Sequence, residues 1–230
     1  MRDRDIDDIL NRGAGSPPDV DPNLLDRISA SVHSGLQPVR PLPSPGTLIA
    51  GLVSICVAVA IAGGVALGPH GIQKMTALQI AIVFPVLALL IFLSAVLAVA
   101  EVIPGSRRIW PSLSPWMFSA AGCIALAVVF GMLFSDPGTE HFVAQGLTCL
   151  RAGLLQAVPA AAGGAWLLRR GFAVNPSAAW YAAGTLAGLA GVAMLELHCA
   201  NFEAPHIIVW HIAVVPLSAL IGFLAARYRR

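Results

Sequence analysis

The sequence predicts an all-α polytopic membrane protein with six transmembrane helices. Of its 230 residues, 57% are hydrophobic and only 11% are charged, and the mean hydropathy is +0.78. The apolar residues also gather in long runs, each close to the roughly 20 residues that a helix needs to cross the hydrocarbon core. This composition excludes a soluble globular domain.

Residues 1–46 form a polar segment that is distinct from the transmembrane part, residues 47–230. A first helical pattern, Asp3–Asn11, is surrounded by aspartates and places three apolar residues on one face: Ile6, Ile9 and Leu10. Acidic residues near a helix start suit the helix dipole. Closely spaced prolines then predict a stiff connector into the first span: Pro38, Pro41, Pro43 and Pro45.

A second helical pattern in this segment begins after Asp21, which suits an N-cap, with Pro22 at the first helical position. Gly35 fits the C-cap. Its apolar residues recur at helical spacing: Leu24, Leu25, Ile28 and Val32.

Both helices are too short to be stable alone, so we expect them to fold when their apolar faces enter a partner's groove. Their acidic flanks favour a basic partner surface. The alternatives are a helix lying on the membrane, which usually carries Lys and Arg rather than Asp, and a disordered tail without a partner.

Each of the six predicted spans is an apolar run of suitable length. They are Thr47–Leu67, Ala77–Ala100, Trp116–Phe134, Leu147–Leu168, Ala178–Leu195 and Ile207–Ala226. No cleavable signal peptide is expected, because the first residues are charged and the first apolar run begins only near Thr47.

The arginines predict the orientation of these spans. They follow the second, fourth and sixth spans: Arg107, Arg108, Arg169, Arg170, Arg227, Arg229 and Arg230. The alternate loops hold Lys74 as their only basic residue. Positive charge marks the cytoplasmic side, so both termini are expected there, in agreement with an even number of spans.

Small residues in the fourth and fifth spans allow helices to approach closely. They are Gly163, Gly164, Gly184, Gly188 and Gly191. Such positions are typical of helix–helix contacts in membranes. Ordinary packing explains them more simply than a dedicated switch between two packings.

Two of the four cysteines, Cys149 and Cys199, fall at the outer edge of the predicted bundle in polar surroundings. Arg151 follows the first, and Glu196 and His198 precede the second. The other two lie inside apolar runs, where small buried hydrophobic roles are expected: Cys56 and Cys123.

Two thiol mechanisms fit this edge. Cys149 and Cys199 form or lose a disulfide as the outside redox state changes, or both thiolates bind a soft metal with His198. His206 and His211 are further candidate ligands, although His211 fits a hydrogen-bonded buried histidine at least as well. The spacings do not match a standard structural zinc site, so no constitutive structural metal is expected.

Arg151 has two expected roles. Two residues after Cys149, it would favour the thiolate and make that thiol more reactive. As a charge within a span, it would also pair with Glu196, because intramembrane charges are usually paired and face the bundle interior.

No catalytic constellation is recognisable, so we expect neither enzymatic activity nor a bound cofactor. An alternative is a small membrane thiol oxidoreductase or metal-ion transporter. A transporter would place polar groups deep in several spans, and an oxidoreductase would more often carry a Cys-x-x-Cys pair. A purely structural subunit would leave the Leu-His-Cys sequence unexplained.

An ordered series of short motifs occupies the second half of the chain. It comprises Gly146-Leu147-Thr148-Cys149-Leu150-Arg151-Ala152-Gly153, Pro159, Leu167-Leu168-Arg169-Arg170-Gly171, Leu197-His198-Cys199 and Trp210-His211. This series resembles the NrsF family of membrane anti-sigma factors. The resemblance extends from the connector to the sixth span.

The resemblance implies a six-span protein of the bacterial inner membrane that holds an extracytoplasmic-function sigma factor inactive. The paired cysteines of the family are associated with sensing metal or oxidative stress, and they correspond here to Cys149 and Cys199. We therefore expect the segment 1–46 to grip the sigma factor through the two apolar stripes, without direct nucleic-acid binding. A metal or redox signal at the thiols would weaken that grip.

Overall fold

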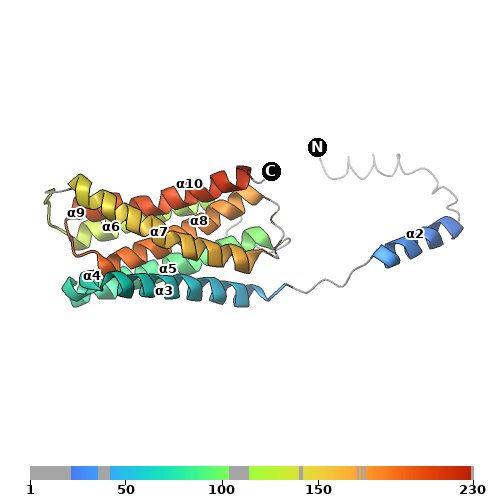
Figure 1. Cartoon of the computed structure of the whole chain (residues 1–230), viewed down its shortest axis with the longest axis horizontal. Coiled ribbons are helices and arrows are strands. Elements are labelled where there is room, and N and C mark those ends of the chain that lie inside the picture. The colour runs from blue at the N-terminus through green and yellow to red at the C-terminus, as the bar shows by residue number, and fades with distance from the viewer. Residues whose placement is uncertain are drawn as a thin grey trace, which may run out of the picture. The chain divides into compact units, whose positions relative to one another are not determined.

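The structure is a computed structural model that describes residues 22–35, 42–103, 114–139, 142–169, 171, 173 and 175–228. Within these ranges the elements are helices, and the only bridge of β type joins Asp136 and Glu203 (Figure 1). Contacts divide the chain into two units, Met1–Pro41 and Leu42–Arg230.

Helix α2, Pro22–Gly35, confirms the second helix predicted for the N-terminal segment. Its four apolar side chains are all about half exposed: Leu24, Leu25, Ile28 and Val32. The predicted first helix, with Ile6, Ile9 and Leu10, lies outside the described residues, as does Asp21.

The second unit is built from long helices that coincide with the predicted spans. They are α3 (Pro45–Leu67), α5 (Ala77–Val102), α6 (Pro115–Leu133), α7 (Phe142–Leu168), α8 (Pro176–His198) and α10 (Ile212–Tyr228). Short elements complete them: α4 (His70–Lys74), α9 (Ala204–His206) and the π-helix η1 (Ile207–His211). The last predicted span, Ile207–Ala226, thus corresponds to η1 followed by most of α10.

Five of these helical stretches are long and apolar enough to cross a membrane. They are Pro45–Leu67, Ala77–Val102, Pro115–Leu133, Pro176–His198 and Ala204–Tyr228. Helix α7 has 27 residues but is not among the five. Gln145, Arg151 and Gln156 lower its hydropathy, and Arg151 is exposed on its surface.

Several helix starts follow directly from local sequence. At three of them, a polar N-cap side chain accepts a backbone hydrogen bond and is followed by proline: Ser44-Pro45, Ser114-Pro115 and Asn175-Pro176. Thr76 and Gln79 form a reciprocal capping box at the start of α5. These caps satisfy backbone donors that the first turn leaves free.

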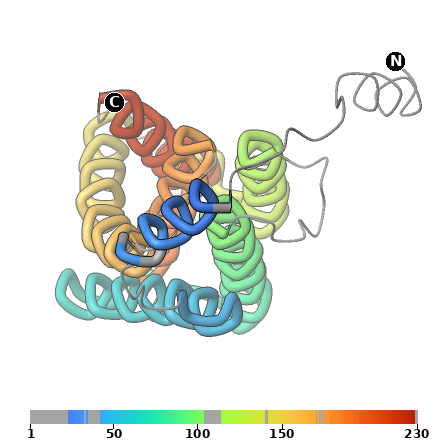
Figure 2. Tube along the Cα trace, turned by 90° about the vertical axis from the view of Figure 1, so that its right-hand side faces the viewer, coloured from blue at the N-terminus to red at the C-terminus, as the bar shows by residue number. Residues whose placement is uncertain are grey.

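Helix α8 is the central helix of the bundle. Of its most apolar 18-residue window, 83% is buried inside the protein, against 28–39% for the other four candidate spans. Viewed end-on, α8 (orange) runs between α7, α10 and α5 (Figure 2). Because neighbouring helices cover it, α8 can consist largely of Gly and Ala and still lie in an apolar environment.

Glycines of α8 bring its backbone against two neighbouring helices. A Cβ atom at Gly188 would lie 2.7 Å from Val215 Cα, and one at Gly184 would meet the carbonyl oxygen of Ser218. Both contacts are with α10. A Cβ at Gly191 would lie 2.5 Å from the carbonyl oxygen of Gly153 in α7. The predicted role of these glycines in helix packing is therefore confirmed.

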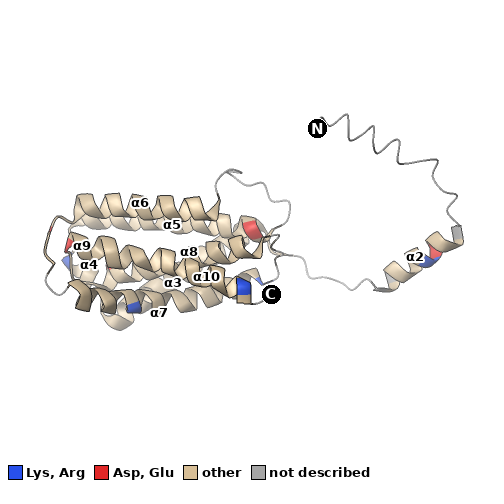
Figure 3. Ribbon diagram, turned by 90° about the horizontal axis from the view of Figure 1, so that it is seen from above, with Lys and Arg blue, Asp and Glu red and all other residues tan. Residues whose placement is uncertain are grey.

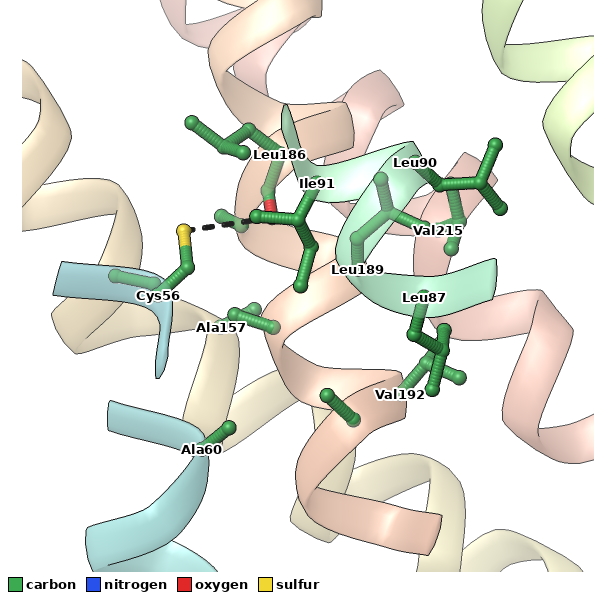
Figure 4. Close-up of a cluster of buried hydrophobic side chains, with 14 of the residues drawn as sticks. Cys56, Ala60, Leu87, Leu90, Ile91, Ala157, Leu186, Leu189, Val192 and Val215 are labelled. Carbon is green, nitrogen blue, oxygen red and sulfur yellow. Dashed lines mark hydrogen bonds between the residues drawn. The ribbon is translucent and has the colours of Figure 1, made fainter. Parts of the chain in front are cut away.

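The core around α8 is apolar and draws on several helices. In Figure 4, Leu186, Leu189 and Val192 of α8 lie among labelled side chains of α3, α5, α7 and α10. Cys56 is buried there, with its Sγ 4.0 Å from the carbonyl oxygen of Leu186. Its expected role as a small buried side chain agrees with this position.

Charged residues lie mostly toward the two ends of the bundle (Figure 3). Arg169 follows α7 and Arg227 lies in the last turn of α10, at the end of the bundle opposite α4 and α9 (Figure 1). The other arginines that predict the orientation lie outside the described residues: Arg107, Arg108, Arg170, Arg229 and Arg230.

We predict that Gly188→Ala destabilises the bundle. The new methyl group would meet backbone atoms of Val214 and Val215 at 2.7–3.0 Å, which cannot move aside without separating α8 from α10. Overpacking of this kind costs about 1–3 kcal/mol. Thermal unfolding in detergent should show a lower Tm.

Gly122→Ala in α6 is the matched control. Its new Cβ would meet only Leu90 Cδ2, at an ordinary 3.6 Å. An equal Tm for the Gly188 and Gly122 variants would contradict backbone packing between α8 and α10.

Candidate functional site

The structure brings the two predicted cysteines together near the end of the bundle that carries α4 and α9. Cys149 lies in the early part of α7, and Cys199 directly follows α8, where its N–H donates to the carbonyl oxygen of Leu195. The two Sγ atoms are 3.5 Å apart, and both thiols are free. Cys199 is buried and Cys149 is half-buried.

Two histidines complete a compact cluster with these thiols. His206 and His211 are 0% and 1% exposed, and His206 Nε2 lies 3.6 Å from Cys199 Sγ. One donor atom from each of Cys149, Cys199, His206 and His211 lies within 4.8 Å of every other. We call these four residues the thiol–imidazole cluster.

A buried carboxylate holds one of the two imidazoles. His211 Nδ1 lies 2.7 Å from Oε1 of Glu196, which is itself 1% exposed. Because a carboxylate only accepts hydrogen bonds, the proton of this bond is on Nδ1, which leaves Nε2 as the second ring nitrogen. That Nε2 has no hydrogen-bond partner in the structure, and neither has Nδ1 of His206.

The π-helix η1 explains how both histidines reach the cluster. His211 lies five positions after His206, a spacing that in an α-helix would turn the two side chains about 140° apart. A π-helix closes i→i+5 hydrogen bonds and therefore aligns such positions. Their rings meet edge to face, with centroids 5.4 Å apart.

The predicted pairing of Arg151 with Glu196 is not formed. Arg151 is exposed on the surface of α7, whereas Glu196 is buried and pairs with His211. The physical reason is the closeness of His211: a buried carboxylate takes a partner that its own buried surroundings supply.

His198 lies beside the cluster but outside the four-residue set. Its Nδ1–H donates to the carbonyl oxygen of Gly68, at 2.9 Å. Gly68 adopts the positive φ of 95° in the turn between α3 and α4. His198 thereby ties the end of α8 to this turn.

Hydrogen bonds fix the loop that carries Cys199 toward His206. Asn201 Nδ2 donates to Gln145 Oε1 of α7 at 2.8 Å, and Asn201 Oδ1 accepts from the N–H of Glu203 at 2.9 Å. The N–H of Ala204 donates to the carbonyl oxygen of Asp136 at 2.8 Å. The loop is thus anchored to α7 and to the segment after α6.

An open pocket of about 730 Å³ leads to the thiols. Lys74, Thr148 and Asn201 contribute to its lining together with both cysteines and His198. His206 and His211 lie behind the cysteines. A small oxidant or ion entering this pocket therefore meets Cys149 and Cys199 first.

The surroundings of Cys199 favour its protonated form. Its pKa is raised, first because its thiol is hydrogen-bonded to Cys149 and second because it is buried; the neighbouring His206 and His211 oppose this shift.

Sequence reasoning placed Cys149 and Cys199 at the same edge of the bundle, left the distance between them open, and gave His206 and His211 only secondary weight. Glu196 entered only as a partner for Arg151. One signal was present: Glu196 directly follows the fifth predicted span and His211 lies near the start of the sixth, and polar residues within membrane spans are usually paired.

The fold and this site define a class: a helical membrane protein with a thiol–imidazole cluster near one end of its bundle. The chain belongs to the NrsF family, described as "Negative regulator of sigma F", which matches residues 33–229. This family is regulatory and acts on a sigma factor. Neither a curated protein nor a solved structure matches the chain.

The family match covers every residue of the thiol–imidazole cluster. It begins at residue 33, after the apolar stripe of α2. The NrsF resemblance predicted from the sequence motifs is confirmed.

We predict that mild oxidation joins Cys149 to Cys199 within one molecule. The two Sγ atoms need to approach from 3.5 Å to about 2.05 Å, the length of a disulfide bond. Peptide mass spectrometry without reduction, after treatment of the purified protein with hydroperoxide, should identify this linked pair.

Cys56 and Cys123 provide the internal control, since both should be recovered as free thiols. A product linked between two molecules, or a disulfide that includes Cys56 or Cys123, would contradict the observed geometry.

Proposed function

We propose that this protein is a six-span anti-sigma factor of the bacterial inner membrane, with both termini in the cytoplasm. Its N-terminal segment sequesters an extracytoplasmic-function sigma factor. A metal or redox signal at Cys149 and Cys199 on the outer face releases it. Family membership supports the anti-sigma role, and the 3.5 Å separation of the two thiols is the observation that carries the sensor role.

Helix α7 supplies the sixth span in this proposal. Its 27 residues correspond to about 40 Å, which exceeds the thickness of the hydrocarbon core. It packs against α3 and α8, both of which are long and apolar enough to cross. In this arrangement the long side chain of Arg151, which is exposed on α7, would reach the headgroups, as long cationic side chains do near a membrane edge.

The arginine distribution supports the orientation. Arg169 and Arg227 lie at the end of the bundle opposite the thiol–imidazole cluster (Figure 1). Cationic ends mark the cytoplasmic side, which leaves the thiols at the outer face. Six spans then return the C-terminus to the side on which the chain enters.

The exposed stripe of α2 supports the docking role. Leu24, Leu25, Ile28 and Val32 are 45–54% exposed along one face of a 14-residue helix. Four large apolar side chains on one face favour insertion into an apolar groove. A sigma factor that binds this face would cause the N-terminal segment to fold on the surface of the sigma factor.

The redox arm is a two-electron reaction. The thiols of Cys149 and Cys199 together lose two protons and two electrons to a hydroperoxide, and the S–S bond forms. The O–O bond of the hydroperoxide breaks and gives one alcohol and one water, or two waters when the oxidant is hydrogen peroxide. The new bond draws α7 toward the end of α8, because Cys149 lies in α7 and Cys199 directly follows α8.

We predict that Leu24→Asp combined with Ile28→Asp frees the sigma factor constitutively. Two charges placed on an apolar docking face should weaken binding at least about 100-fold. Co-purification of the sigma factor with the full-length protein from detergent-solubilised membranes measures this directly.

Ala30→Asp is the matched control, since Ala30 is exposed on the opposite face of α2. It adds one carboxylate, against two in the test variant, and should leave the complex intact. A complex that survives Leu24→Asp and Ile28→Asp would move the docking site away from α2.

We further predict that replacing both Cys149 and Cys199 with Ser leaves sigma binding unchanged and abolishes its release by hydroperoxide. The serines keep the size of the side chains but cannot form the disulfide. Release from native membranes, followed by the amount of sigma factor in the soluble fraction, is the measurement.

Cys56→Ser with Cys123→Ser is the control and should respond like the wild type, because neither thiol is in the cluster. Normal release in the Cys149 and Cys199 variant would exclude the thiol pair as the sensor.

A further inference from the structure

We propose that Cys149, Cys199, His206 and His211 form a tetrahedral S₂N₂ site for a thiophilic divalent cation of the zinc type. Glu196 is the outer residue that positions His211. The sensing role of such an ion rests on the function proposed above, but its binding does not. The four residues come from α7, the segment after α8, α9 and η1.

The separations between donor atoms match such an ion. Zinc–sulfur and zinc–nitrogen bonds of about 2.3 and 2.05 Å predict tetrahedral edges of about 3.8 Å for S···S and about 3.6 Å for S···N. The observed distances are 3.5 Å between the two Sγ atoms and 3.6 Å between Cys199 Sγ and His206 Nε2. The remaining donor pairs lie within 4.8 Å, so the donors must close by about 1 Å at most to bind one ion.

The hydrogen bonding of His211 leaves one of its ring nitrogens available as a ligand. Its Nδ1–H is held by Glu196, and its Nε2 is buried without a hydrogen-bond partner. A buried polar atom without a partner costs free energy, and coordination removes that cost. A carboxylate that holds the far nitrogen of a ligating histidine is the usual second-shell arrangement at zinc sites.

The charges of the site also balance. Two thiolates neutralise a divalent ion, and two neutral imidazoles add no charge. A buried site near the end of an apolar bundle requires such neutrality, since an uncompensated charge there is costly. Binding therefore replaces the two thiol protons with one cation.

The donor set excludes hard cations. Magnesium and calcium take oxygen ligands, whereas paired thiolate and imidazole suit zinc and similar ions. His198 has no part in the proposed site, because it lies outside the four-residue set. This ligand set differs from the set of Cys149, Cys199 and His198 expected from the sequence.

Ion binding and disulfide formation exclude each other. Both use the Sγ atoms of Cys149 and Cys199, so the bound ion protects the thiols and the disulfide displaces the ion. The same four residues thereby have two alternative cross-linked states, one reversible by chelation and the other by reduction.

The test is cobalt binding to the full-length, reduced protein in detergent. Co²⁺ reports its own coordination by visible absorption. One equivalent should give the intense visible bands of a tetrahedral ion together with sulfur-to-cobalt charge-transfer bands, and Zn²⁺ should displace it. Weak octahedral bands, or no sulfur-to-cobalt bands, would overturn the proposal without any variant.

Single variants test the ligand set. His206→Gln and His211→Gln should each weaken zinc binding at least about 100-fold. Glu196→Gln should weaken it about 10–100-fold, because the carboxylate that orients His211 is lost. His198→Gln is the matched control and should bind zinc like the wild type. Loss of binding in that variant, or full binding in both His206→Gln and His211→Gln, would overturn the assignment.

These measurements use no sigma factor, so the two proposals fail separately. A tetrahedral cobalt site in a protein whose sigma factor is never released by metal would leave the site standing and remove its sensing role. Cysteine-dependent release by oxidant without a tetrahedral cobalt spectrum would overturn the metal site alone.

Discussion

The contact on which the rest of the structure depends is the packing of α8, backbone against backbone, on α10 and α7. Gly184 and Gly188 allow it on one side and Gly191 on the other. This packing surrounds α8 with other helices and fixes where its last residues lie. Glu196 and Cys199, at the end of α8, therefore meet Cys149 of α7 and His211 at the start of the final span.

The thiol–imidazole cluster and Glu196 form a group of buried polar side chains near the end of an otherwise apolar bundle. Glu196, His206 and His211 are buried almost completely, and two imidazole nitrogens are left without a partner. Buried polar groups in membranes are costly unless they are paired or serve a function. The incomplete pairing therefore favours a site that a ligand or a new covalent bond completes.

Length and hydropathy allowed the helices to be predicted, because each apolar run is bounded by polar or proline residues. That Cys149 and Cys199 share one edge of the bundle was also predictable, whereas the 3.5 Å between their Sγ atoms was not. The ligand set was not predictable either. Sequence proximity favoured His198, but its ring turns to Gly68, and the π-helix that aligns His206 with His211 leaves no periodic signal in the sequence. Arg151 failed as a partner for Glu196 because it lies on the outer surface of α7.

Contacts between α7 and α3 connect the cluster to the helix that begins the bundle. Gln156 Nε2 of α7 donates to the carbonyl oxygen of Val59 in α3, and a Cβ at Gly163 would lie 3.0 Å from Ile55. Gly51 faces Leu167 further along the same pair of helices. A disulfide or an ion at Cys149 constrains one end of α7, while α3 begins at the other end of the bundle, where the chain enters from the N-terminal segment. Under the function proposed above, a shift of α7 at the cluster would pass to α3 through these contacts, since packed helices move as rigid elements.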